Sequence, residues 1–425
     1  MQGSCERIDA GQFPAFGLMG RSNVDRVGAW MTLPVEFVLF GLTLLAVALT
    51  HKYALQAALI GLGVIAAWKV GVAGFPAGAG FAGLVGHLKY EWVILANLLA
   101  LLVSFALLAR HFEASRVPEW MPALLPDDWK GGFVLLVLIF VLSSILDNIA
   151  AALIGGTVAL RVFSGRVHIG YVAAIVAASN GGGSGSVLGD TTTTMMWIAG
   201  KSPWSVLTAY AAAIPALVVF GVPASLQQHR FSPIEKDAAS GVVIDWGRIG
   251  VVAVILLTAV AVNIWTNLYY PAVLDHFPVL GVAVFVVVVV TSLWRRADWF
   301  VVPDAAKGAV FLLALVAAAS MMPVERLPPP SVAVTFGMGV LSAVFDNIPL
   351  TALALKQGGF DWGLLAYAVG FGGSMMWFGS SAGVAITRLF PEAQSADGWL
   401  KGAWHVPLAY VVGFGVQSVL TGWHP

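Results

Sequence analysis

The sequence predicts an all-α polytopic membrane protein. We expect two inverted-topology repeats of five transmembrane helices plus a re-entrant hairpin each, with discontinuous helices at a site near the membrane midplane. First, 59% of the 425 residues are hydrophobic and only 10% are charged, whereas soluble domains carry roughly 25% charged residues. Second, runs such as "VILANLLALLVSFALLA" are long enough to cross the ~30 Å hydrocarbon layer as helices. Third, polar motifs recur at matching places in the two halves.

Hydropathy divides the chain into twelve apolar segments, six in each half. The predicted segments are 34–50, 54–72, 91–109, 132–160, 168–200 and 203–226, followed by 248–268, 278–294, 308–323, 331–356, 361–390 and 403–421. Polar residues interrupt the fourth segment of each half, and glycines interrupt the fifth. Such breaks are tolerated at membrane depth only where protein or a watery cavity satisfies the backbone.

These segments set the expected domain boundaries. Residues 1–33 are polar, so we expect a poorly ordered N-terminal extension, with Met31 as an alternative translation start. Repeat 1 then covers 34–226, a cytoplasmic linker covers 227–247, and the inverted repeat 2 covers 248–425.

The repeat is visible in two pairs of motifs. "SSILDNIAAAL" at 143–153 resembles "LSAVFDNIPLTAL" at 341–353, and "GGSGSVLGD" at 182–190 aligns with "GGSMMWFGS" at 372–380. Each half therefore contains three spans, a segment with Asp-Asn at its centre, a glycine-broken span and a final span. Repeats with paired broken helices are typical of secondary transporters, whose binding site lies at the repeat interface.

The distribution of Lys and Arg orients the repeats. If each Asp-Asn segment is a hairpin that enters and leaves on one side, 14 of the 22 basic residues share a side. That side is then cytoplasmic. Five crossings per half is an odd number, so the second half is inverted and the C-terminus is extracytoplasmic. If the Asp-Asn segments were full crossings, this bias would largely dissolve.

Two Asp-Asn pairs are the strongest functional signal. Asp147-Asn148 and Asp346-Asn347 each lie within an apolar segment, where a charge costs about 2.5–3.5 kcal/mol on insertion scales. The alternative is structural, because an Asx turn also shapes the tip of a hairpin. We favour function, since Ser-Gly or Asn-Gly would turn the chain without a charge.

The stretch "SNGGGSGSVLGDTTTT" adds a third carboxylate. Glycines at 181–183 and 185 are expected to unwind the backbone and expose carbonyl groups, and Asp190 then precedes a half-helix with Thr191–Thr194 in its first turn. The alternative is that Asp190 is only an N-cap.

Together these residues predict an all-oxygen site for a hard cation such as Na⁺. Asp147, Asn148, Asp190, Asp346 and Asn347 are the expected metal ligands. Because burial disfavours an unpaired carboxylate, a proton and a cation would exclude each other there. The full set of candidate ion-binding residues is Asp147, Asn148, Ser179, Asn180, Asp190, Thr191, Thr192, Asp346, Asn347, Ser380 and Ser381.

The motifs "SNGGGSGSVLGDTTTTMMWIAG", "LDNIAAAL", "VFDNIPLTA" and "GFGGSMMWFGSSAGVA" resemble those of NhaD-type sodium/proton antiporters. These belong to the ion-transporter superfamily, with arsenite permeases and citrate or dicarboxylate transporters. The resemblance implies a homodimeric Na⁺ or Li⁺ for H⁺ exchanger of the bacterial inner membrane, without a cofactor. It maps the family's site onto Asp147-Asn148, Asp346-Asn347 and 190–193. The family's aromatic residue and proline before Gly-Asp are replaced here by Ser184–Val187.

Two other functions compete with cation exchange. A sodium-coupled carboxylate or oxyanion permease on the same scaffold would bind its anion with the hydroxyl groups of Ser179, Thr191, Ser380 and Ser381. An intramembrane aspartyl protease would pair two aspartates, but its Gly-x-Gly-Asp motif needs glycine where this chain has Val187. We therefore expect a transporter and not an enzyme.

Overall fold

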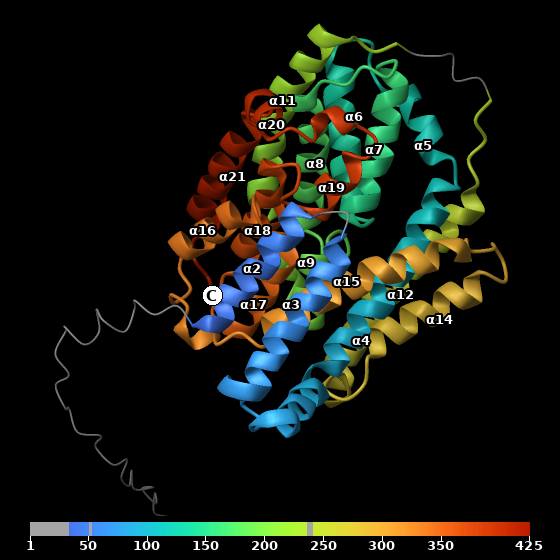
Figure 1. Ribbon diagram of the computed structural model, residues 1–425. Helices are drawn as coiled ribbons and strands as arrows, with labels where there is room; N and C mark the ends of the chain where they lie inside the picture. Colours follow the sequence, from blue (N-terminus) through green and yellow to red (C-terminus); the bar gives the residue numbers. More distant parts are fainter. Residues whose placement is uncertain (1–33, 51–52, 236–240) are drawn as a thin grey trace, which may run out of the picture.

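The computed structural model describes residues 34–50, 53–235 and 241–425 (Figure 1). The expected extension 1–33, with Met31, and part of the linker lie outside these residues. The described residues form helices and connecting turns without a β-strand. Five helical segments are long and apolar enough to cross a membrane, and α20 with α21, bent by 61°, would make a sixth. The all-α polytopic class is confirmed.

The helices of the first half follow the predicted segments, except that α4 begins at Gly80, well before the predicted start at 91. The last predicted segment contains α10 and α11, and α5 is a short connecting helix. The bounds are α2 (Val35–Leu49), α3 (Ala54–Trp68), α4 (Gly80–Glu113), α5 (Val117–Trp120), α6 (Trp129–Ser143), α7 (Asn148–Val162), α8 (Ile169–Ser184), α9 (Thr191–Ile198), α10 (Pro203–Leu207) and α11 (Tyr210–Phe231).

The second half repeats this order, with α13 as an added short helix. Its helices are α12 (Trp246–Tyr269), α13 (Pro271–Leu274), α14 (Val279–Thr291), α15 (Val302–Ser320), α16 (Val332–Ser342), α17 (Asn347–Gln357), α18 (Trp362–Gly372), α19 (Ser381–Ile386), α20 (Ala396–Gly402) and α21 (His405–Thr421). Both Asp-Asn segments are thus pairs of short helices, and both glycine-containing spans are broken.

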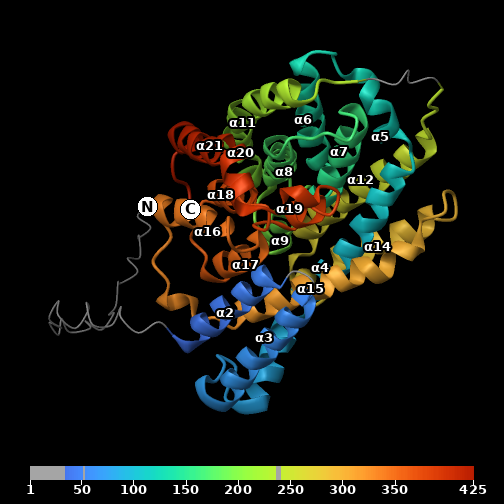
Figure 2. The same ribbon diagram turned by 45° about the horizontal axis from the view of Figure 1, so that its top comes forward.

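The helices pack into two bundles, and each bundle draws on both halves of the chain (Figures 1 and 2). We call α2, α3, α4, α12, α14 and α15 the scaffold bundle, because these helices pack on one another. We call α6–α8, α11, α16 and α18–α21 the core bundle. Helices α9 and α17 pack against each other and also contact both bundles, α9 through α4 and α18, and α17 through α15 and α18. The two breaks that precede α9 and α17 therefore lie near the bundle boundary.

Equivalent hydrogen bonds hold the two Asp-Asn segments in place. Ser143 Oγ donates to the carbonyl of Ser179 at 2.5 Å, and Ser342 Oγ donates to the carbonyl of Val369 at 2.7 Å. Both bonds join the end of the first helix of an Asp-Asn segment to the following broken span. The internal repeat seen in the sequence is therefore also a repeat of local structure.

The glycines of the first broken span behave differently from the prediction. Residues 181–183 stay helical within α8, and the break begins only at Gly185. Close packing explains them, because a Cβ at Gly182 would lie 2.0 Å from the carbonyl oxygen of Phe140. The equivalent Gly372 has the same constraint, 2.2 Å from the carbonyl oxygen of Gly339. Small residues at helix contacts are a general device in membranes, where close backbone approach drives association.

Candidate functional site

Both Asp-Asn aspartates start a helix at the break of their segment. The carboxylate of Asp147 accepts the backbone N–H of Ile149 at 3.1 Å, and that of Asp346 accepts the N–H of Ile348 at 3.1 Å. Their backbone angles are nearly the same, φ −53° and ψ 142° at Asp147 against φ −51° and ψ 141° at Asp346. The structural role considered for these residues is therefore real. It leaves one carboxylate oxygen of each outside this cap bond.

Asp190 and Ser380 are a second equivalent pair. Asp190 caps α9 by accepting the N–H of Thr192 at 3.1 Å, and Ser380 caps α19 by accepting the N–H of Gly383 at 3.2 Å. The side chain of Asp190 is almost fully buried, at 2% exposure. A negative charge is favoured at a helix N-terminus, but an eight-residue helix offsets only part of the cost of burying a carboxylate.

The three aspartates line one cavity of about 470 Å³. Asp147, Asp190 and Asp346 share it with the hydroxyl-bearing Thr191 and Ser381. Apolar residues of the scaffold helices α2, α4 and α15 form much of the remaining wall, among them Leu44, Leu98, Leu101, Phe105, Leu312 and Leu315. The cavity therefore lies between the scaffold bundle and the two Asp-Asn segments.

A buried hydrogen-bond network lies on the side of the Asp-Asn segments and joins the two halves. Asn180 is fully buried; its Oδ1 accepts from Asn148 Nδ2 at 3.0 Å, and its own Nδ2 donates to the hydroxyls of Ser374 and Ser380, both at 3.0 Å. A second link, from Asn347 Nδ2 to Asp190 Oδ2 at 3.3 Å, also crosses between the halves. Each Asp-Asn segment is thus tied to a glycine-broken span.

The predicted residues divide into three groups. Asp147, Asp190, Thr191, Asp346 and Ser381 line the cavity. The side chains of Asn148, Asn180, Asn347 and Ser380 form the network behind it. Of the remaining two, Ser179 Oγ bonds to the carbonyl of Val176, and Thr192 Oγ1 is buried beside the carboxylate of Asp190.

The threonines after Asp190 also have a defined structural task. Thr193 Oγ1 donates to the carbonyl of Ser186 at 2.6 Å, and Thr194 Oγ1 donates to the carbonyl of Val187 at 2.9 Å. These two carbonyls were candidates for exposed ligands in the unwound segment. Instead, the first turn of α9 satisfies them, which accounts for Thr193 and Thr194 without a bound ion.

The carboxylates share a cavity without forming one compact ligand cluster. Among the described residues, no three His, Cys, Asp or Glu side chains come close enough to hold one metal ion. Asp190 nevertheless lies near enough to Asp147 and Asp346 for their charges to repel. Three ionised carboxylates in one partly apolar cavity are therefore unfavourable. Protons or cations that neutralise these charges would stabilise the folded protein.

Sequence reasoning missed several residues of the site. Glu113 and Asp304, which lie at helix ends far from the motifs, also line the cavity, as does Arg388 in the turn after α19. Ser374, which accepts from Asn180, stands in the aligned Gly-Gly-Ser motif but was not singled out. The repeat pointed to Ser374, because it aligns with Ser184. The other three needed the tertiary structure.

Comparison with known proteins identifies three relatives. Sodium/proton antiporter 1 of Arabidopsis thaliana is 27% identical over 289 residues, 60% of this chain and 49% of the plant protein. The Na⁺/H⁺ antiporter NhaD of Alkalimonas amylolytica is 28% identical over 344 residues, 68% of each chain. NhaD of Vibrio parahaemolyticus is 28% identical over 331 residues, 66% of this chain and 78% of that protein.

These matches bear directly on the predicted resemblance. No family model matches the chain, and the matched region spans about half the length of the plant relative. All three relatives are named as antiporters, and none as an enzyme. The resemblance to NhaD-type sodium/proton antiporters, read from the Asp-Asn and Gly-Asp-Thr motifs, is confirmed over most of this chain.

Proposed function

We propose that this relative of NhaD-type antiporters exchanges Na⁺, or Li⁺, for H⁺ across a membrane by alternating access. The observation that carries the proposal is the placement of Asp147, Asp190 and Asp346, from both halves of the chain, in one cavity. The names of the relatives support Na⁺ and H⁺ as the exchanged ions.

The charges of the cavity favour a cation over an anion. Five carboxylate side chains line it, those of Glu113, Asp147, Asp190, Asp304 and Asp346, against one cationic side chain, Arg388. An anionic substrate would enter against this excess of negative charge, whereas a cation would be attracted. Uptake of a carboxylate or oxyanion on the same scaffold is therefore the less favoured function.

In the proposed mechanism Asp147 and Asp346 bind either Na⁺ or H⁺. Each has a carboxylate oxygen outside its cap bond. On Asp346 this oxygen accepts the hydroxyl of Ser381 at 2.8 Å, so a cation there would share or replace that bond. Asp190 contributes a third carboxylate, and Thr191 and Ser381 supply hydroxyl oxygens, the hard donors that Na⁺ prefers.

The amides behind the cavity would position these carboxylates. Asn148 and Asn347 follow the two aspartates directly and bond to Asn180 and Asp190. A change of protonation at either Asp-Asn pair would therefore reach the opposite half of the chain through Asn180 or Asp190. Coupling of this kind is what exchange requires, because the loaded site has to reorient as a unit.

The two bundles offer a route to alternating access. The core bundle, which carries the network, would move against the scaffold bundle, and the apolar cavity wall would be the sliding surface. The two repeats, at 34–226 and 248–425, would be inverted relative to each other. This inversion would give the motion two end states, one open to each side of the membrane. We also propose that the site lies near the membrane midplane and that the protein is a homodimer in the bacterial inner membrane. Its C-terminus would lie on the extracytoplasmic side.

The proposal is tested by acidifying everted membrane vesicles and adding Na⁺, Li⁺ or K⁺. We expect Na⁺ or Li⁺ to collapse the pH gradient, and Asp147→Asn together with Asp346→Asn to abolish the response. Asp397→Asn is the matched control, because Asp397 is exposed on α20 and pairs with Lys401. Full activity of the double variant, or Na⁺-dependent uptake of labelled citrate without any pH response to Na⁺ alone, would contradict the assignment.

A further inference from the structure

A second cavity, of about 400 Å³, lies at the C-terminal end of α4 and has a basic lining. It is formed by the end of α4, the start of α12 and the loop that precedes α15. Its charged and polar lining residues are Arg110, His111, Glu113, Arg248, Arg296 and Asp298. We propose that this cavity binds the phosphate headgroup of an anionic phospholipid.

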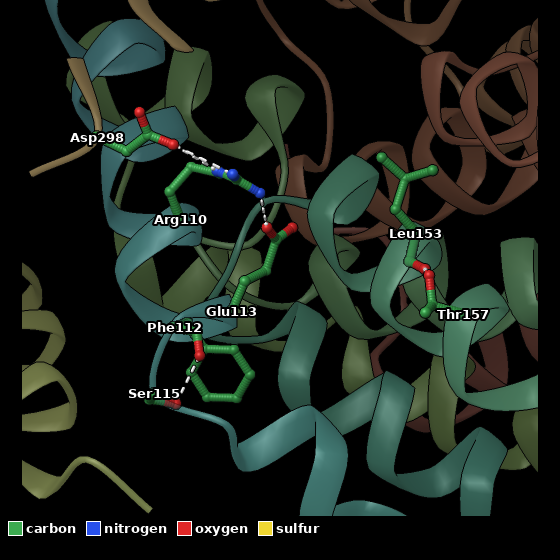
Figure 3. A network of polar contacts seen from close by, with 7 residues as sticks. All are labelled: Arg110, Phe112, Glu113, Ser115, Leu153, Thr157 and Asp298. Atoms are coloured by element: carbon green, nitrogen blue, oxygen red, sulfur yellow. Dashed lines mark hydrogen bonds and ion pairs between the residues drawn. The ribbon is translucent and has the colours of Figure 1, made fainter. Parts of the chain in front are cut away.

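The ion pairs around the cavity leave a positive charge in excess. Arg110 pairs with both Glu113 and Asp298 (Figure 3), and Arg248 and Arg295 share Asp245. With Arg296 included, four arginines therefore stand against three carboxylates, those of Glu113, Asp245 and Asp298. Arg296 is exposed and has no ion pair among the described residues, so an anion in the cavity would find an unneutralised guanidinium.

His111 provides a second, independent sign of a missing acceptor. Its side chain lines the cavity and is 1% exposed, and Arg248 lies 3.2 Å from its Nδ1. A guanidinium can only donate hydrogen bonds, so Nδ1 accepts, and Nε2 carries the hydrogen of the neutral ring. This Nε2 is buried without a partner among the described residues. A phosphate oxygen would satisfy it, and buried donors are rarely left unpaired.

The surroundings of the cavity favour a lipid over a free phosphate ion. Large apolar side chains beside the basic residues are strongly exposed, with Trp246 at 72%, Leu293 at 89%, Trp294 at 60% and Phe300 at 95%. Helix packing brings the Trp294 ring to the start of α12, since it lies 3.5 Å from a Cβ placed on Gly250. Aromatic side chains of this kind sit at headgroup level in membranes, and basic pockets between helix ends bind anionic headgroups. Acyl chains would cover the apolar rim.

The headgroup site also touches the first cavity. Glu113 lines both cavities, and Arg110 holds its carboxylate. A phosphate that competes for Arg110 would weaken this ion pair and leave Glu113 freer to face the first cavity. Lipid binding itself does not depend on the proposed antiport, so a binding measurement can succeed even if the transport proposal fails.

The test is native mass spectrometry of the detergent-purified full chain, titrated with phosphatidylglycerol or phosphatidylethanolamine. We expect tighter binding of phosphatidylglycerol, and a loss of about fivefold in its affinity in Arg296→Gln, because one basic side chain contributes about that factor near a membrane surface. Arg296 is exposed, so its substitution should leave folding intact. The control is Arg230→Gln, which removes an exposed arginine at the end of α11 in the core bundle.

His111→Phe provides a second variant that keeps the ring volume but removes the donor. We expect it also to lower the affinity for phosphatidylglycerol, while Arg230→Gln stays at the wild-type value. Equal affinity of wild type and Arg296→Gln, or no preference between the two lipids, would overturn the proposal. Binding of glycerol 3-phosphate as tight as that of phosphatidylglycerol would overturn the lipid as ligand and assign a soluble phosphate instead.

Discussion

Replacing Asn180 by alanine removes the residue that joins the first Asp-Asn segment to the second broken span. Asn180 makes three buried side-chain hydrogen bonds, to Asn148, Ser374 and Ser380. Hydrogen bonds between helices in a membrane protein contribute about 0.6 kcal/mol each on average, so their loss amounts to about 2 kcal/mol. The amide of Asn148 also loses its partner, and a buried unpaired donor costs about 1–3 kcal/mol. The expected total is therefore about 3–5 kcal/mol.

The assay is the thermal stability of the detergent-purified protein, followed by the loss of its monodisperse peak in size-exclusion chromatography. Asn97→Ala is the matched control, because Asn97 is also buried in a helix but accepts only one hydrogen bond, from the N–H of Gly281 at 2.9 Å. We expect the melting temperature of Asn180→Ala to fall clearly further than that of Asn97→Ala. Equal losses in the two variants would refute the idea that Asn180 is the central connection.

Three further predictions concern other parts of the fold. Gly182→Ala and Gly372→Ala should abolish folding, because the added Cβ would lie 2.0 Å and 2.2 Å, respectively, from a backbone carbonyl oxygen. The measurement is the loss of monodisperse protein. Gly41→Ala, which has open space at its Cβ, should fold normally. Lys356→Met should lower the melting temperature more than Lys89→Met. Lys356 Nζ donates to the carbonyls of Ser320 and Met322, each at 2.6 Å, and hydrogen bonds from a charged donor contribute about 1.5–3 kcal/mol. Equal melting temperatures of the two variants would refute this link between α17 and the end of α15. Burial lowers the pKa of His168, the N-cap of α8, whose Nδ1 accepts the N–H of Gly170 in the first turn of that helix. The neutral ring therefore contributes stability that is present above the unfolded pKa of about 6.5 and is lost as pH falls through the folded value. The melting temperature should drop less between pH 7 and pH 5 in His168→Asn, which keeps a cap, than in the wild type, and equal drops would contradict it.

Much of the fold was predictable because the membrane imposes strong rules on sequence. Apolar segments had to be helices, and a carboxylate in the middle of such a segment marked a helix break. The structure has breaks directly before Asn148 and Asn347 and a helix start after Asp190, as predicted. The order of helices in the second half followed from its motif similarity to the first.

Other features could not be predicted, for identifiable physical reasons. Glycine permits both unwinding and close helix packing, and only the contact of Gly182 with Phe140 decides between them. The hydroxyls of Thr193 and Thr194 satisfy backbone carbonyls seven residues earlier, a geometry set by the shape of the break. Glu113 and Asp304 reach the cavity through packing of α4 and α15, and a single sequence contains no signal for such long-range contacts.

The central claim is that a proton and a cation compete for the same buried carboxyl groups. It is tested most directly by adding Na⁺ to the purified, weakly buffered protein near neutral pH and following proton release with a pH indicator dye. The account predicts a saturable release of protons with Na⁺, which disappears in the variant that combines Asp147→Asn and Asp346→Asn and persists in Asp397→Asn. Saturable Na⁺ binding measured by calorimetry, without any release of protons, would contradict it.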